Sequence, residues 1–195
     1  MKSDNCKLSE SRTIHCALLG DGLIGKTTLF RTYISKKFRK DYVATMLDKY
    51  TVRMAVGGKE FMVNIFDTPG QDDFVHERVI TYKESEVFVL CFSTCDRESF
   101  LRVQDLLLPE IKEFTHRKVP IILVGTQTDL RKGTRESDIT TREGAKLAKE
   151  IGADCYLECS AKKQQGLKEV FDHVVISALK DRKRKGNILR RLFKK

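Results

Sequence analysis

The sequence predicts an α/β fold in which a mostly parallel sheet is covered by helices on both faces. Short apolar runs of strand length alternate with segments of helical spacing, which is the order that parallel strands joined by crossover helices require. A glycine-rich loop separates the first strand from the first helix. The length of 195 residues suits a single domain with one sizeable core. Together these three observations favour one α/β domain.

Local pattern places the elements in chain order. An apolar run from Arg12 to Leu19 predicts the first strand, and the segment from Thr27 to Lys37 has the pattern of a helix. The dipeptide Gly57-Gly58 supplies positive φ in a tight turn, so the alternating segments on both sides of it predict an antiparallel hairpin. The hairpin strands are expected over Lys49 to Val56 and Lys59 to Phe66, and the later strands over Val87 to Phe92, Val119 to Val124 and Cys155 to Leu157. The last helix is expected to carry an apolar stripe of Leu167, Val170, Phe171, Val174, Val175 and Ala178.

Composition and charge exclude several classes of protein. Apolar residues make up 41% and charged residues 33%, and no run approaches the roughly 18 apolar residues of a membrane span. Six cysteines without a secretory signal favour free, mostly buried thiols, and no cysteine pair has the histidine partners of a zinc site. Positions 1–12 are polar and lack the apolar core of a signal peptide. The expected organisation is a flexible leader over 1–12, a domain over 13–180 and a basic tail over 181–195.

The glycine-rich loop has the residues of a phosphate-binding site. It fits the pattern G-x-x-x-x-G-K-[ST] and lies between a strand and a helix, where backbone N–H groups and the positive helix end face bound phosphates. Lys26 is expected to reach the outer phosphates and Thr27 to bind Mg²⁺. A glycine-rich turn without a ligand is the alternative. The candidate residues are Gly20, Asp21, Gly22, Leu23, Ile24, Gly25, Lys26, Thr27 and Thr28.

A second motif bears on the choice of base. Thr126-Gln127-Thr128-Asp129 resembles the base-reading motif of small GTPases, which usually runs Asn-Lys-x-Asp, and its Thr-Gln start followed by Asp-Leu resembles the Rho family, especially the Rac and cell-division-control subgroups. A carboxylate accepts hydrogen bonds from both N1–H and the 2-amino group of guanine, a donor pair that adenine lacks. The resemblance therefore implies that Asp129 selects guanine and that the stem of Gln127 stacks on the base beside Thr126.

Two more segments resemble the guanine end of such a site. Ser160-Ala161-Lys162 resembles the Ser-Ala motif of the family, in which the backbone N–H of the Ala position meets the guanine carbonyl oxygen. Phe38 matches the aromatic residue that lies edge-on to guanine in these proteins. A polar strand end is the alternative reading of the first segment.

The loops that follow the first helix and the hairpin resemble the two switches of small GTPases. Asp67-Thr68-Pro69-Gly70-Gln71 resembles Asp-x-x-Gly-Gln, and Tyr42-Val43-Ala44-Thr45 resembles the first switch. The resemblance implies that Asp67 holds Mg²⁺ through water, that the Gly70 N–H bonds the γ-phosphate and that Gln71 orients the attacking water. The implied catalytic residues are Gln71, Lys26 and Thr45, the implied metal ligands are Thr27, Thr45 and Asp67, and Tyr42 joins the nucleotide-binding set.

Resemblance to the Rho family implies a small G domain with a six-stranded sheet that binds GTP or GDP with Mg²⁺ and hydrolyses GTP slowly. It also implies Rho-type effectors, exchange factors and GTPase-activating proteins, and a role in the actin cytoskeleton and cell shape. Pro69 and Ala44 depart from the Rho pattern. A nucleotide-bound scaffold with little or no turnover therefore stays open as the alternative.

The end of the sequence is basic and amphipathic. From Lys180 to Lys195 there are nine Lys or Arg against one Asp, and no cysteine follows Cys159, so we expect no prenyl group. Helical spacing places Ile188, Leu189, Leu192 and Phe193 on one face, which favours binding to an anionic membrane. The expected location is the cytoplasm and the inner face of the plasma or internal membranes. Nuclear import or RNA binding by the same residues, and a solvated end without a partner, are the alternatives.

Overall fold

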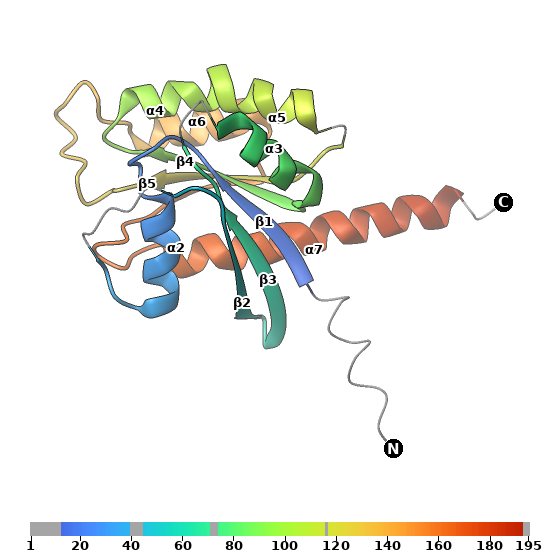
Figure 1. Ribbon diagram of the computed structural model, residues 1–195. Helices are drawn as coiled ribbons and strands as arrows, with labels where there is room; N and C mark the ends of the chain where they lie inside the picture. Colours follow the sequence, from blue (N-terminus) through green and yellow to red (C-terminus); the bar gives the residue numbers. More distant parts are fainter. Residues whose placement is uncertain (1–12, 40–44, 71–73, 116, 193–195) are drawn as a thin grey trace.

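A single sheet of six strands organises the part of the chain that the structure describes (Figure 1). The computed structural model describes residues 13–39, 45–70, 74–115 and 117–192. The sheet has the order β2-β3-β1-β4-β5-β6, and every pair of neighbours is parallel except β2 and β3. The prediction of an α/β fold with a mostly parallel sheet is confirmed. The strands are β1 (Thr13–Leu19), β2 (Asp48–Val56), β3 (Lys59–Asp67), β4 (Val87–Ser93), β5 (Ile121–Thr126) and β6 (Cys155–Glu158).

Helices cover both faces of the sheet and form two cores with it. Figure 1 shows α2 and α7 on one side and α3 to α6 on the other. Fully buried Phe171 of α7 belongs to the first core, and fully buried Tyr82 of α3 belongs to the second. The helices are α2 (Lys26–Ser35), α3 (Val75–Glu84), α4 (Arg97–Arg102), α5 (Leu108–Phe114), α6 (Thr141–Ile151) and α7 (Leu167–Leu192), and a π-helical turn, η2 (Val103–Leu107), joins α4 to α5.

Element boundaries differ from the sequence predictions where single residues stop a pattern. Helix α2 ends two residues early because Lys36 adopts the left-handed conformation, with φ 55°, and closes the last turn through its N–H. Strand β5 starts two residues late, after Pro120, which has no N–H to give to a ladder. Gly57 and Gly58 have φ values of 56° and 72°, as the predicted hairpin requires. The expected antiparallel pair is therefore confirmed.

Helix α7 is the longest element and continues beyond position 180. Its predicted apolar stripe is buried throughout, from Leu167 to Ala178. Arg182 then donates hydrogen bonds to both carboxylate oxygens of Glu86, at 2.9 and 2.7 Å, and another to the backbone carbonyl of Thr13. One unbroken helix thus crosses the expected boundary between domain and tail, and its contacts with the body extend to Arg182. No described helix is long and apolar enough to span a bilayer.

The described cysteines are all free thiols, as the sequence predicts. Cys16, Cys91 and Cys159 are buried in the sheet region, and burial raises the pKa of each thiol. A buried thiol with a raised pKa is a poor nucleophile and metal ligand. These three cysteines therefore serve the core.

A buried ion pair holds α3 against α5. The Arg78 guanidinium donates to both carboxylate oxygens of Glu110, at 2.9 and 2.7 Å, and the side chains are 2% and 7% exposed. The Tyr82 hydroxyl also donates to Glu110. The third nitrogen of Arg78 lies 3.5 Å from the carbonyl oxygen of Pro69, in the loop after β3. The pair therefore fixes the helix that follows this loop.

Replacing Arg78 by Met should lower the free energy of unfolding by about 3–5 kcal/mol, because the Glu110 carboxylate would stay buried without its ion pair. Lys83, exposed on the same helix, gives the matched control, and Lys83→Met should change that free energy by less than about 0.5 kcal/mol. Urea denaturation followed by circular dichroism measures both. Equal unfolding midpoints for the two variants would contradict a stabilising role of the pair.

Candidate functional site

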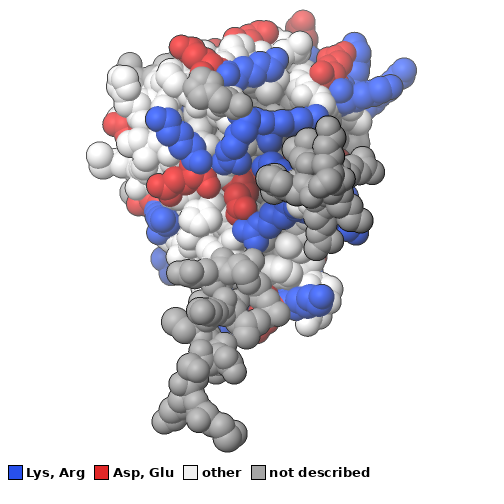
Figure 2. Space-filling model, turned by 90° about the vertical axis from the view of Figure 1, so that its right-hand side faces the viewer, with Lys and Arg blue, Asp and Glu red and all other residues white. Residues whose placement is uncertain are grey.

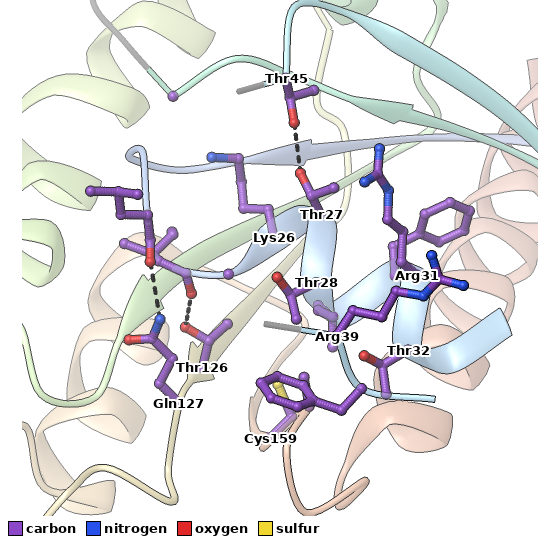
Figure 3. Close-up of a pocket in the computed structure, with 18 of the residues that line it drawn as sticks. Lys26, Thr27, Thr28, Arg31, Thr32, Arg39, Thr45, Thr126, Gln127 and Cys159 are labelled. Atoms are coloured by element: carbon purple, nitrogen blue, oxygen red, sulfur yellow. Dashed lines mark hydrogen bonds between the residues drawn. The ribbon is translucent and has the colours of Figure 1, made fainter. Parts of the chain in front are cut away.

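A cavity of about 950 Å³ opens at the edge of the sheet where the parallel strands end. Ligands of open α/β sheets bind at this edge, outside the carboxyl ends of the strands. Figure 3 shows Lys26, Thr27 and Thr45 around one part of the cavity and Thr126, Gln127 and Cys159 around another. The predicted site residues in its lining are Gly22, Leu23, Ile24, Gly25, Lys26, Thr27, Thr28, Phe38, Thr45, Gly70, Thr126, Gln127, Asp129, Ala161 and Lys162.

Glycines let the loop between β1 and α2 turn tightly over the end of the sheet. Gly20 has φ 141°, and a Cβ atom there would lie 2.4 Å from the carbonyl oxygen of Cys91 in β4. Gly25, which precedes the first residue of α2, has φ 89°. The first turn of α2 contains no acidic residue, so the positive end of the helix is left to face the cavity. Backbone N–H groups and a helix N-terminus are together suited to bind phosphate.

Lys26 lies under this loop and is 6% exposed. Its ammonium group donates to the carbonyl oxygens of Gly20 and Asp21, at 2.7 and 2.6 Å. Burial lowers the pKa of Lys26, although the neighbouring thiol of Cys91 and the carboxylates of Asp67 and Asp21 act in the opposite direction. The ammonium is thus held by the loop at the floor of the cavity, where an anionic ligand would favour its charged form.

Three oxygen groups beside Lys26 fit a Mg²⁺ ion. The hydroxyl oxygens of Thr27 and Thr45 lie 2.8 Å apart, although the residues come from α2 and from the segment before β2. Asp67, at the end of β3, is 0% exposed, and neither of its carboxylate oxygens has a hydrogen-bond partner among the described residues. Burial raises the pKa of Asp67, while Thr27 and Lys26 favour its charged form. Mg²⁺ prefers such oxygen ligands, and a cation here would compensate the buried carboxylate.

The loop after β3 packs directly on the loop between β1 and α2, the candidate phosphate-binding loop. A Cβ atom on Gly70 would lie 2.2 Å from both the backbone carbon of Asp21 and the backbone nitrogen of Gly22, so only glycine fits. Thr68, two residues earlier, donates from its hydroxyl group to the carbonyl oxygen of Leu18 at 2.6 Å. This places the backbone at Gly70 beside the loop that would hold the phosphates.

Thr126 and Gln127 connect the end of β5 to the same loop. The Thr126 hydroxyl lies 2.6 Å from the carbonyl oxygen of Ile24 and is buried. The amide group of Gln127 donates to the carbonyl oxygen of Leu23 at 3.0 Å and accepts from the Ser93 hydroxyl at 2.7 Å. Both residues therefore position the phosphate-binding loop through long-range hydrogen bonds, which the motif alone did not indicate.

The carboxylate of Asp129 is oriented by the segment after β6. The Ser160 hydroxyl donates to Oδ1 of Asp129 at 2.6 Å and accepts from the Lys163 N–H at 3.0 Å. The Thr128 N–H donates to the carbonyl oxygen of Cys159 at 3.2 Å, which joins the two segments again. Asp129 is half-buried and lines the cavity, as do Ala161 and Lys162. The arrangement presents a fixed acceptor to a ligand with paired donors.

The remaining predicted residues have other places. Gly20, Asp21, Asp67 and Ser160 lie behind the lining and contact residues within it. Tyr42 and Gln71 lie outside the described residues. Sequence reasoning missed Arg31 and Arg39, which line the cavity and are labelled in Figure 3. In the sequence, only the presence of several basic residues after Lys26, without a motif, could have indicated them.

The chain also matches a known protein family. The family model of the Ras family covers residues 15–180, from β1 to the middle of α7. This range includes every described residue that lines the cavity.

Proposed function

Because the chain belongs to the Ras family and is therefore a small GTPase, we propose that it acts as a molecular switch that binds GTP or GDP with Mg²⁺ and hydrolyses GTP slowly. The observation that carries this proposal is a single cavity with two chemically distinct parts. A phosphate-binding loop with a buried lysine forms one part, and the Asp129 carboxylate oriented by Ser160 lies in the other. The first part suits a polyphosphate, and the second suits guanine.

For hydrolysis, the protein supplies position and charge. Lys26 and the N-terminus of α2 stabilise negative charge on the outer phosphates. Thr27, Thr45 and the carboxylate of Asp67 would hold Mg²⁺, which supplies charge neutralisation at the phosphate oxygens. Gln71 would orient the attacking water for in-line displacement of GDP. Most of the catalysis of phosphoryl transfer is positioning of this kind, and a slow rate is expected without a partner that adds an arginine.

Switching follows from the two loops that meet the phosphate-binding loop. Thr45 contacts Thr27 through its hydroxyl, and the Gly70 backbone contacts that of Asp21 and Gly22. A γ-phosphate that binds both loops would hold them in one arrangement, and its loss on hydrolysis would release them. Met46, directly after Thr45, is 73% exposed and is available to an effector in the GTP form. Rho-type effectors, exchange factors and GTPase-activating proteins, with output to actin and cell shape, are the proposed partners.

A nucleotide-bound scaffold is the second candidate function. The observation that favours it is Pro69, which precedes Gly70 and lacks the N–H of an ordinary residue. Its fixed φ stiffens the backbone where the second switch begins. A switch that moves less would bind nucleotide normally and hydrolyse it poorly.

The end of α7 suggests where the switch acts. Figure 2 shows Lys and Arg side chains, with some Asp and Glu among them, on the face that lies at the right of Figure 1, toward which α7 runs. Lys183, Arg184 and Lys185 are exposed on that helix. We infer that this basic helix binds anionic lipid at the inner face of the plasma or internal membranes, each cation contributing about 1 kcal/mol near such a surface. Nuclear import is the competing explanation of the same charges.

Replacing Asp129 by Asn should shift preference from guanine to xanthine nucleotides, because the amide donates a hydrogen bond where the carboxylate accepted one. Competition of GTP and XTP for a fluorescent guanine nucleotide measures the preference. Glu136→Gln removes a carboxylate from an exposed loop and serves as control. Unchanged GTP affinity in the Asp129→Asn variant would remove this residue from the base site.

Replacing Gln71 by Leu should reduce GTP hydrolysis at least about tenfold and leave GTP affinity nearly intact, since the side chain is assigned to the attacking water and not to the bound nucleotide. Single-turnover hydrolysis with protein preloaded with GTP measures the rate. If the wild-type and variant rates are equal, the scaffold is the better description of this protein.

Deleting residues 186–195 should weaken binding to vesicles that contain phosphatidylserine without changing nucleotide affinity, although Lys183, Arg184 and Lys185 remain. Leu192→Ser with Phe193→Ser removes apolar insertion and keeps every charge, while added salt screens the charges. Both changes should reduce sedimentation with vesicles. Lys132→Gln with Arg135→Gln, in the exposed loop before α6, is the charge control and should sediment like wild type. Equal sedimentation of intact and truncated protein at low and physiological salt would favour nuclear import.

A further inference from the structure

The phosphate-binding loop contains a carboxylate, which is an unfavourable neighbour for a polyphosphate. From Gly20 to Gly25 the loop carries one ionisable side chain, that of Asp21. Asp21 lies behind the cavity lining, and like charges repel each other more strongly when they are shielded from solvent. A loop that binds GTP therefore needs a way to neutralise this carboxylate.

Arg102 neutralises it from a distant part of the chain. Nε of Arg102, at the end of α4, lies 2.9 Å from Oδ1 of Asp21, across a separation of 81 residues in the sequence. The side chains are 28% and 19% exposed, so solvent screens this ion pair less than a pair at the open surface. We propose that Arg102 is a positioning residue for nucleotide binding: it neutralises the Asp21 carboxylate and fixes the phosphate-binding loop for a triphosphate. This inference rests on the proposed function.

The helix that carries Arg102 has an uncommon geometry at this point. Arg102 immediately precedes the π-helical turn η2, whose residues Val103 and Leu107 are buried in the second core. A π turn adds about one residue to the helix and so rotates the residues before it by roughly 100° relative to those after it. Arg102 thereby faces the phosphate-binding loop while Val103 and Leu107 still face the core. Such turns occur often at functional sites.

Asp21 is also the residue at which the other parts of the phosphate site meet. Its carbonyl oxygen accepts from the ammonium group of Lys26 at 2.6 Å. Its backbone carbon is the atom that a Cβ on Gly70 would approach to 2.2 Å. Its side chain is held by Arg102. Movement of Asp21 would therefore displace both the lysine that meets the outer phosphates and the loop that meets the γ-phosphate.

Two effects of removing Arg102 follow, and they separate this role from general support of the fold. The freed carboxylate should repel GTP more than GDP, since GTP carries more negative charge. The loss of nucleotide affinity caused by removing Arg102 should become small when the Asp21 carboxylate is absent. A structural role of Arg102 would instead affect both nucleotides equally, whether or not position 21 is charged.

The test measures the affinities of full-length protein for fluorescent GDP and a fluorescent non-hydrolysable GTP analogue, with Mg²⁺ at low salt. Arg102→Gln should weaken binding of the GTP analogue about tenfold and binding of GDP less, and high salt should reduce the difference. Arg102→Lys, which keeps the charge, should recover most of the loss. In an Asp21→Asn background, Arg102→Gln should change affinity less than about twofold, and this double-mutant cycle isolates the pair.

Arg97 is the matched control because it lies on the same helix and pairs with Glu143, at 3.0 Å, instead of the loop. Arg97→Gln should bind both nucleotides like wild type, and thermal unfolding verifies that each variant is folded. Equal losses for both nucleotides, persisting in the Asp21→Asn background, would overturn the inference, as would wild-type affinity of Arg102→Gln. Failure of the wild-type protein to bind guanine nucleotides would instead overturn the proposed function.

Discussion

Gly20 lies against the backbone of β4, and Gly70 lies against the backbone of Asp21 and Gly22. Both contacts are so close that no side chain fits between the backbones. The first contact seats the phosphate-binding loop on β4, and the second seats the loop after β3 on the phosphate-binding loop. The positions of Lys26, Thr27 and Asp67 all depend on this stack of three backbones. The contacts are made by peptide groups, so the geometry of the site is stiff and any added methyl group must push the layers apart.

The charged groups around the cavity are more favourable with a bound ligand than in the protein alone. Burial disfavours the ammonium form of Lys26 and the carboxylate form of Asp67, and both are among the least exposed ionisable groups of the described residues. A magnesium nucleotide would favour both charged forms, because it places anionic phosphate near the amine and a cation near the carboxylate. Binding should then stabilise the fold by a free energy that rises with the logarithm of ligand concentration once that concentration exceeds the dissociation constant. This links tight nucleotide binding to the stability of the domain.

Local sequence pattern was sufficient for most of the fold because its signals act over a few residues. The Gly57-Gly58 turn and the apolar stripe of α7 are examples. The sequence motifs also predicted residues that line one cavity although they lie as far apart in the chain as Gly22 and Lys162. Contacts that depend on tertiary position were not predictable from the sequence. The Thr126 hydroxyl bonds to the carbonyl oxygen of Ile24 across 102 residues. The Arg102–Asp21 ion pair depends on a π turn that no residue pattern indicates. Pro120, which lacks an N–H, and Lys36, which adopts the left-handed conformation, shifted element boundaries in ways that propensity describes only weakly.

The unbroken course of α7 has a consequence for its own stability. Oppositely charged side chains three or four residues apart on a helix stabilise it. Arg184 and Lys185 both pair with Asp181, about one turn earlier, and Arg182 binds the same part of the helix to Glu86. The exposed cations that would face lipid thus also stabilise the helix that carries them. Modification that removes these cations would weaken the helix as well as its attraction to an anionic surface.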